Sequence, residues 1–224
     1  MSKLRAKNIE TATGTTLTLG ASGDAIAVSS DSVQANTWQD TGGNSLFVSD
    51  GSGTLSNVNS GFGGGYALLK TEVADGASSI DITSSIDSTY DEYMFICTNL
   101  NPSSDTATFQ FQVNAAGGSG FNETITSTYF RAYNAEDGSG AALEYMLAED
   151  QAQGTAYQDL SLGTGHDASE CTDGILHLFS PSSTTYVKQF YSRFNEVHSS
   201  LYSMDLYCAG YINTASAIDE ISFK

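Results

Sequence analysis

The sequence predicts an all-β protein, with a C-terminal β-sandwich or jelly-roll-like domain that follows a thin β-rich segment. Three observations lead to this fold class. Charged residues make up only 15% of the 224 residues, against about 25% in an ordinary globular domain. Ser, Thr, Gly, Asn and Asp take their place, and these residues favour turns and exposed strands over helices. Short apolar runs that alternate with polar residues recur between breaks rich in Gly, Ser and Pro.

Residues 1–65 are expected to form an anchoring and oligomerising β segment that ends in a Gly-rich linker. Its strand-like units carry too few apolar residues to bury a core alone; they are TTLTLG, DAIAVSS and NSLFVSDG. Such units gain burial when identical chains wind or stack together, and a flexible arm is the alternative. The stretch SGFGGGYALLK is interpreted as the linker into the next domain.

Residues 66–224 are expected to fold as the β-sandwich domain. In chain order, the expected strands are YALLK, SSIDIT, EYMFICTNL, ATFQFQVN, NETITSTYFRAYN, ALEYMLA, AYQDLSLG, GILHLFS, TYVKQFYSRFNEV, SLYSMDLYCAGYI and AIDEISFK. Ile175 and Leu176 of GILHLFS point to opposite faces, which predicts a strand covered on both sides. Only LEYMLAEDQAQ, residues 143–153, could instead form a short helix.

The last segment, AIDEISFK, predicts a buried strand beside an open edge. Ile221 and Phe223 share one face, whereas Ile218 needs a β-bulge to join them. We expect burial on the Phe223 side. The resemblance described below is to domains that continue into a closing strand, which implies an edge or gap here where a neighbouring subunit or a continuation of the chain would pair. The sequence leaves open whether the chain is complete at Lys224.

The charge balance argues against nucleic acid and membrane partners. The chain has 26 acidic and 8 basic residues, for a formal net charge of −18, and such a surface repels phosphate backbones and anionic lipid. No apolar run reaches the length of a membrane span, and we expect no signal peptide because no apolar run follows the basic residues of MSKLRAKNIETATG. Cys97, Cys171 and Cys208 form no disulfide framework, which indicates free thiols and folding in a reducing cytoplasm.

Several long segments resemble a β-sandwich domain of tail-fibre-like structural proteins from marine tailed bacteriophages. They are FNETITSTYFRAY, DQAQGTAYQ, GILHLFSPSSTTYVKQFYS and AGYINTASAIDEISFK. The N-terminal TGTTLTLGASGDAIAVSS is similar to the thin β segments that open many phage fibre proteins. The resemblance implies a location in the virion, after assembly in the host cytoplasm, and it supplies no catalytic residues.

The function expected is that of a non-enzymatic virion structural protein, a tail-fibre-like appendage for host attachment. Its partners would be two further copies in a homotrimer, other virion proteins through the N-terminal segment, and a glycan or protein of the host surface. The alternatives are a capsid decoration protein (a cement or head-fibre protein) and, ranked last, a glycan-active depolymerase. Which host and receptor are involved stays open.

No catalytic, cofactor-binding or metal-binding set stands out in the sequence. Three serines lie in Gly-rich turns but complete no GxSxG motif, namely Ser52, Ser119 and Ser139. Only three histidines could serve as a base, namely His166, His177 and His198. The segment GHDASEC is a weak zinc signal, with His166, Asp167, Glu170 and Cys171 close together. The acidic turns at 50–53 and 137–140 leave a calcium site open.

Carboxylates and aromatic rings are the remaining candidates for chemistry. Three pairs of carboxylates are adjacent in the sequence: Asp91–Glu92, Glu149–Asp150 and Asp219–Glu220. The two members of a pair would point to opposite faces of a strand, so they could not act together on one substrate bond. Most rings of two aromatic clusters should be core, while a few exposed tyrosines could stack on sugar rings. The clusters hold Tyr129, Phe130, Tyr133, Tyr186, Phe190, Tyr191 and Phe194.

Overall fold

A computed structural model describes residues 37–39, 42, 44–49, 55–56, 58 and 66–224. The chain divides into two compact units, Met1–Ala67 and Leu68–Lys224. All regular elements among the described residues are β-strands, which confirms the all-β prediction. No helix in this part of the chain is long and apolar enough to cross a membrane.

The described part of the first unit is a small antiparallel sheet in the order β1-β2-β3. Its strands are β1 (Thr37–Gln39), β2 (Ser45–Ser49) and β3 (Leu55–Ser56). The indole of Trp38 on β1 stacks on the ring of Phe47 on β2, with 5.9 Å between ring centroids. Strand β2 lies within the expected unit NSLFVSDG, whereas TTLTLG, DAIAVSS and the linker glycines fall outside the described residues.

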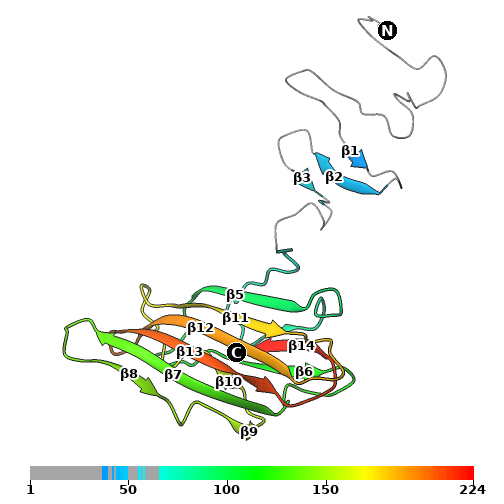
Figure 1. Cartoon of the computed structure of the whole chain (residues 1–224). Helices are drawn as coiled ribbons and strands as arrows, with labels where there is room; N and C mark the ends of the chain where they lie inside the picture. Colours follow the sequence, from blue (N-terminus) through cyan, green and yellow to red (C-terminus); the bar gives the residue numbers. More distant parts are fainter. Residues whose placement is uncertain (1–36, 40–41, 43, 50–54, 57, 59–65) are drawn as a thin grey trace, which may run out of the picture. The chain divides into compact units, whose positions relative to one another are not determined.

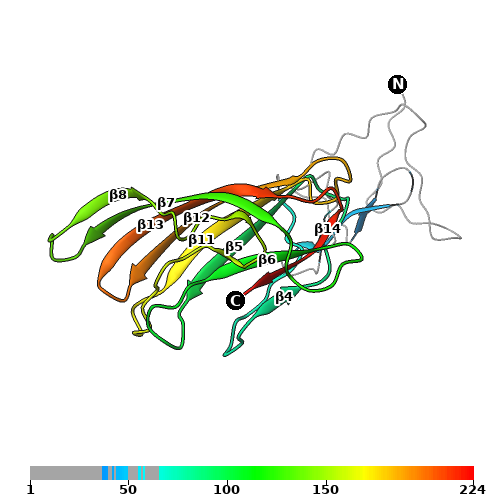
Figure 2. The same cartoon turned by 90° about the horizontal axis from the view of Figure 1, so that it is seen from below.

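The second unit is a sandwich of two antiparallel sheets (Figures 1 and 2). The smaller sheet has the order β10-β6-β14-β4, and the larger has the order β5-β11-β12-β13-β7-β8, with β9 also paired to β7. The strands are β4 (Ile80–Ile82), β5 (Glu92–Leu100), β6 (Gln110–Ala115), β7 (Ile125–Ala135), β8 (Ala141–Tyr145), β9 (Ala152–Gly154), β10 (Gln158–Asp159), β11 (Thr172–Phe179), β12 (Lys188–His198), β13 (Tyr202–Ile212) and β14 (Ile218–Phe223).

The core of the sandwich lies between the two sheets, as strand alternation requires. In β12, Phe190 and Phe194 are buried, whereas Tyr191 and Arg193 on the opposite face are exposed. Phe190 meets the ring of Phe111 from the smaller sheet edge to face, with 5.0 Å between centroids. Further fully buried side chains of the two inner faces are Val113, Ile125, Tyr129, Leu176, Leu178, Ile212 and Ile221.

Ten of the eleven strand segments expected after residue 65 contain a strand, and YALLK does not. Residues 66–70 are exposed coil, with Leu68 86% exposed. A strand needs a hydrogen-bonded neighbour, and this apolar run pairs with none in the described chain. The helix considered for residues 143–153 is also absent, because this stretch holds the end of β8, a turn and the start of β9.

The prediction that GILHLFS is covered on both sides is wrong. Leu176 and Leu178 point into the core and are fully buried, but Ile175 and His177 lie on the opposite face and are only partly buried. No second layer covers that face among the described residues, because the smaller sheet packs on the inner side alone. We call this uncovered side of the seven-stranded sheet the outer face.

The C-terminal strand is buried as expected but has no open edge. Ile218, Ile221 and Phe223 are all buried, and the pairing of β14 with β6 shifts register between Ile218 and Glu220, which confirms the bulge. The expected unpaired edge is wrong, because β14 lies between β6 and β4 and pairs with both. The short strand β4 of the same chain takes the position expected of a neighbouring subunit.

Candidate functional site

A row of large side chains crosses the outer face over six strands. The pairing registers place these residues directly opposite one another from β5 to β8. In this order they are Ile96, Ile175, Arg193, Tyr207, Phe130 and Tyr145. We call the row the outer ladder. Cross-strand neighbours on one face lie within contact distance, so the ladder is a continuous surface of rings, aliphatic side chains and one guanidinium.

The centre of the outer ladder is held in place by stacking and by an ion pair. Phe130 and Tyr207 stack with 4.8 Å between centroids and 5° between ring planes. The Arg193 guanidinium lies 5.3 Å from the Tyr207 ring centroid, and its Nε and Nη2 donate to the two carboxylate oxygens of Asp205 at 2.9 and 2.8 Å. The hydrogen bond from Arg193 lowers the pKa of Asp205, so this pair stays charged near neutral pH.

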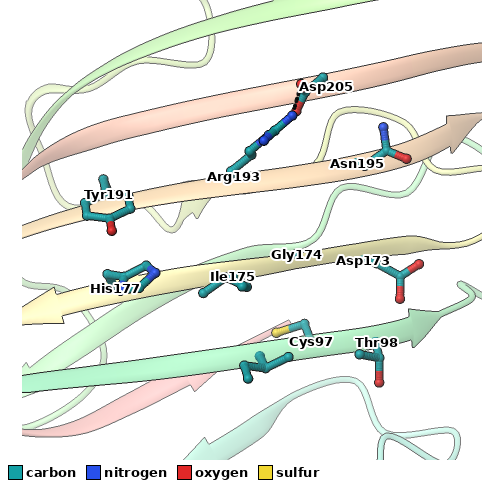
Figure 3. A pocket seen from close by; sticks show the side chains of 11 residues that line it. Cys97, Thr98, Asp173, Gly174, Ile175, His177, Tyr191, Arg193, Asn195 and Asp205 are labelled. Carbon is teal, nitrogen blue, oxygen red and sulfur yellow. Dashed lines mark hydrogen bonds and ion pairs between the residues drawn. The ribbon is translucent and has the colours of Figure 1, made fainter. Parts of the chain in front are cut away.

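A hollow of about 610 Å³ lies on the outer face over β5, β11 and β12, and Ile96, Ile175 and Arg193 of the outer ladder are among its lining residues (Figure 3). Its size falls within the range of small-ligand sites. At one end stand the rings of Tyr191 and His177, and at the other stand Asp173, Asn195 and Thr98. Arg193 lies between the two ends and reaches toward Asp205 on β13. We call this feature the sheet hollow.

The aromatic end of the sheet hollow is a packed group of rings. Tyr191 and His177 stack with 4.5 Å between centroids and 19° between planes. Phe179 packs against both rings, at 6.2 Å from His177 and 5.6 Å from Tyr191. His177 Nδ1 lies 2.6 Å from Glu92 Oε1 on the neighbouring strand β5. These contacts fix the orientation of Tyr191, which is still 46% exposed.

The polar end of the sheet hollow combines fixed groups with free hydrogen-bonding capacity. Asp173 Oδ1 accepts from the Asn99 backbone N–H at 2.6 Å. The Asn195 side-chain amide donates to the Met204 carbonyl at 2.7 Å, which orients the amide and leaves its oxygen as an acceptor. The two hydrogen bonds to Asp205 use two of the five N–H donors of Arg193. This end therefore offers both donors and acceptors to a ligand.

The three histidines are held by partners other than a serine hydroxyl. His166 Nδ1 lies 2.6 Å from Asp105 Oδ1, His177 bonds Glu92, and His198 Nδ1 accepts from the Ser200 backbone N–H at 3.0 Å. Ser52 falls outside the described residues. The structure thus gives no support to a nucleophile and base among these residues.

The segment GHDASEC forms a tight loop. The Glu170 carboxylate accepts from the Asp167 backbone N–H at 3.0 Å, and Cys171 lies 3.4 Å from Asp173. Among the described residues, no three His, Cys, Asp or Glu side chains gather in a way that could hold a metal ion. The turn at 137–140 is closed by Asp137, which accepts from the Ser139 N–H at 2.8 Å. The turn at 50–53 lies outside the described residues.

The three cysteines are free thiols, as the sequence indicates. Burial raises the pKa of Cys97 to about 12 and also raises the pKa of Cys208. Because the thiolate is the reactive form, neither thiol is suited to nucleophilic chemistry near neutral pH.

The structure brings together a pair of carboxyls that the sequence does not reveal. Glu149 hydrogen-bonds the carboxyl of Asp159, although the two residues belong to different segments. The Gln110 amide also donates to Asp159 at 2.5 Å. Burial, and next the bond to Glu149, raise the pKa of Asp159 to about 7. Neither residue lines the sheet hollow, so the pair bears on stability.

The Asp159→Asn variant is expected to unfold with less pH dependence than the unchanged protein. A carboxyl whose pKa is raised in the folded state destabilises the fold progressively as pH rises from about 4 to about 7, and fully above that. Asparagine keeps the acceptor for Gln110 without the charge. Above pH 7 we expect it to stabilise the fold by about 1–2 kcal/mol, allowing for solvent screening.

Urea unfolding between pH 4 and 8 measures this difference, with the exposed Asp91→Asn as the control. Equal curves for Asp159→Asn and the unchanged protein across that range would contradict the expectation.

The aromatic clusters divide between the core and the outer face. Tyr129, Phe190 and Phe194 are core, and Tyr133 is partly buried against it, whereas Phe130, Tyr186 and Tyr191 are exposed. The prediction that most of the seven rings are core is therefore met by only three fully buried rings. His177, Tyr207 and Tyr145 were not predicted as surface groups. Strict alternation in TYVKQFYSRFNEV and SLYSMDLYCAGYI could have assigned Tyr191, Arg193 and Tyr207 to one shared face.

Comparisons of the chain with protein families, with curated proteins and with solved structures find no match. The function of the candidate site therefore has to be inferred from its geometry and from the sequence.

Proposed function

We propose that the chain is a non-enzymatic attachment protein of a tailed-phage virion, whose β-sandwich binds the host surface through the outer face. The observation that carries the proposal is the outer ladder, which crosses six strands of the larger sheet and which no layer formed by residues 68–224 covers. Soluble domains seldom leave a contiguous row of aromatic and aliphatic side chains exposed unless it binds something. The resemblance of the sequence to tail-fibre-like proteins supplies the virion context.

The N-terminal segment would join the protein to itself and to other virion proteins. Its described part is a three-stranded sheet in which Trp38 stacks on Phe47 but is still 39% exposed. Ordering such a segment costs about 1–2 kcal/mol per residue in backbone entropy, and contact with other copies offsets that cost. A homotrimer is the assembly we propose.

Virions that carry the chain provide the test. Gold-labelled antibodies against the β-sandwich are expected to mark the tail, at tens of copies or fewer per particle, and the purified protein is expected to attach to the host bacterium. Labelling over the whole capsid would instead identify a decoration protein and contradict the proposal.

Two measurements on the purified protein complete the test. Light scattering should give the mass of three chains, and a stable monomer would contradict the proposed assembly. Incubation with host envelope glycans should release no new reducing ends. Turnover that a single Asp→Asn or Glu→Gln change abolishes would identify an enzyme.

A further inference from the structure

We infer that the sheet hollow is a binding site for a short, uncharged oligosaccharide, with Tyr191 as its stacking platform. The inference rests on the proposed attachment function and names the ligand class and the residues that recognise it. It is drawn from the arrangement of ring faces and hydrogen-bonding groups in the hollow.

The aromatic end has the properties of a platform for a pyranose ring. A sugar ring presents C–H groups on its faces, and these pack on an exposed aromatic ring. The ring of Tyr191 is exposed but already oriented by His177 and Phe179, and His177 is fixed by Glu92. A ligand therefore orders no loose side chain when it binds, which favours affinity.

The polar end is suited to the hydroxyls of a sugar, which both donate and accept hydrogen bonds. Asp173 and the amide oxygen of Asn195 are acceptors, and the remaining N–H groups of Arg193 are donors. Backbone and side-chain bonds hold all three groups in place. Bidentate contacts from charged groups are stronger and more directional than neutral ones, so this end can select among the hydroxyl patterns of hexoses.

Charge decides between neutral and acidic sugars. The hollow has Asp173 and Asp205 against the single guanidinium of Arg193, which is already paired with Asp205. Glu92 adds another carboxylate beside His177, in a chain of net charge −18. These carboxylates would repel the carboxylate of a uronic or sialic acid, and the hollow has no unpaired cation to bind it. An uncharged oligosaccharide is therefore the ligand that fits.

The same geometry disfavours a peptide strand in the hollow. An extended peptide gains affinity by pairing with a free sheet edge. The hollow lies on the face of the sheet, where β11 is paired with β5 on one side and β12 on the other. The backbone N–H and C=O groups below the hollow therefore already form hydrogen bonds within the sheet. Arg193, with a side chain 66% exposed, would also be costly to bury beneath a second protein layer.

The experiment measures binding of neutral and acidic oligosaccharides to the full-length protein. An array of both kinds, followed by calorimetry on the best neutral hexose oligosaccharide, should give a dissociation constant for the unchanged protein. Tyr191→Ala is expected to weaken binding at least tenfold, and Asn195→Ala several-fold. Tyr186→Ala removes an exposed ring outside the hollow and should leave affinity unchanged. Thermal unfolding of each variant confirms that it is folded.

The outcomes separate this inference from the proposed function. If the protein attaches to host cells but binds no neutral oligosaccharide, or prefers acidic ones, the inference is overturned and the attachment function stands. If Tyr191→Ala binds as well as the unchanged protein, the hollow is not the site. Protection of the outer face from solvent in the oligomer, measured by hydrogen exchange or surface labelling of Tyr191, would also overturn it. Absence of any attachment would contradict the proposed function itself.

Discussion

Replacing Phe223 by alanine is expected to lower the free energy of unfolding by about 3–5 kcal/mol. The ring is 6% exposed. It stacks on Phe109 with 5.6 Å between centroids and 8° between planes, and it packs against Phe95 of the opposite sheet at 5.5 Å. Removing it leaves a cavity between two sheets, each of which is kept rigid by its own backbone hydrogen bonds, so the neighbouring rings can fill it only partly.

Urea or guanidinium unfolding of the full-length protein measures the loss. Phe223→Leu keeps most of the volume and should cost far less than alanine. Tyr186→Ala, at a position 73% exposed, should stay within about 0.5 kcal/mol of the unchanged protein. A loss below about 1 kcal/mol for Phe223→Ala would mean that the C-terminal strand is not part of the core.

Most strands of the sandwich could be predicted because their alternation is a local property of the sequence. ATFQFQVN and TYVKQFYSRFNEV each have one apolar face, and a single buried face is what a two-sheet sandwich requires. The segment YALLK has the same composition but no partner strand, and pairing is a long-range property that a local pattern does not contain. The prediction of an unpaired edge beside β14 was wrong for the same reason, because β4, which pairs with β14, lies far away in the sequence.

The candidate site could be predicted only in part. Alternation assigns Tyr191 and Arg193 to the face opposite Phe190 and Phe194, so their exposure follows once the core face is known. Their neighbours do not follow, because the outer ladder depends on a sheet order that places β11 beside β5 and β13 beside β7. The pair of Glu149 and Asp159 was missed for a related reason, since contact between them arises only when separate segments fold together.

Gly174 links the stability of the larger sheet to the shape of the sheet hollow. It lies on β11 among the residues that line the hollow, and its missing side chain would point into the core. A Cβ placed there would overlap the ring of Phe194 and the carbonyl oxygen of Arg193 on the neighbouring strand β12. The Phe194 ring is fully buried, so it has no free space to move into.

Gly174→Ala is therefore expected to destabilise the fold by about 1–3 kcal/mol through overpacking. Relief of the overlap requires β11 and β12 to move apart, which shifts Ile175 and Arg193 on the outer face. We expect the same variant to bind the oligosaccharide several-fold more weakly while it remains folded. Gly140→Ala is the matched control, because a Cβ at Gly140 meets no atom within 4 Å and its φ is not left-handed. Chemical denaturation and calorimetry measure the two effects, and a Gly174→Ala variant equal to Gly140→Ala in both would contradict this packing.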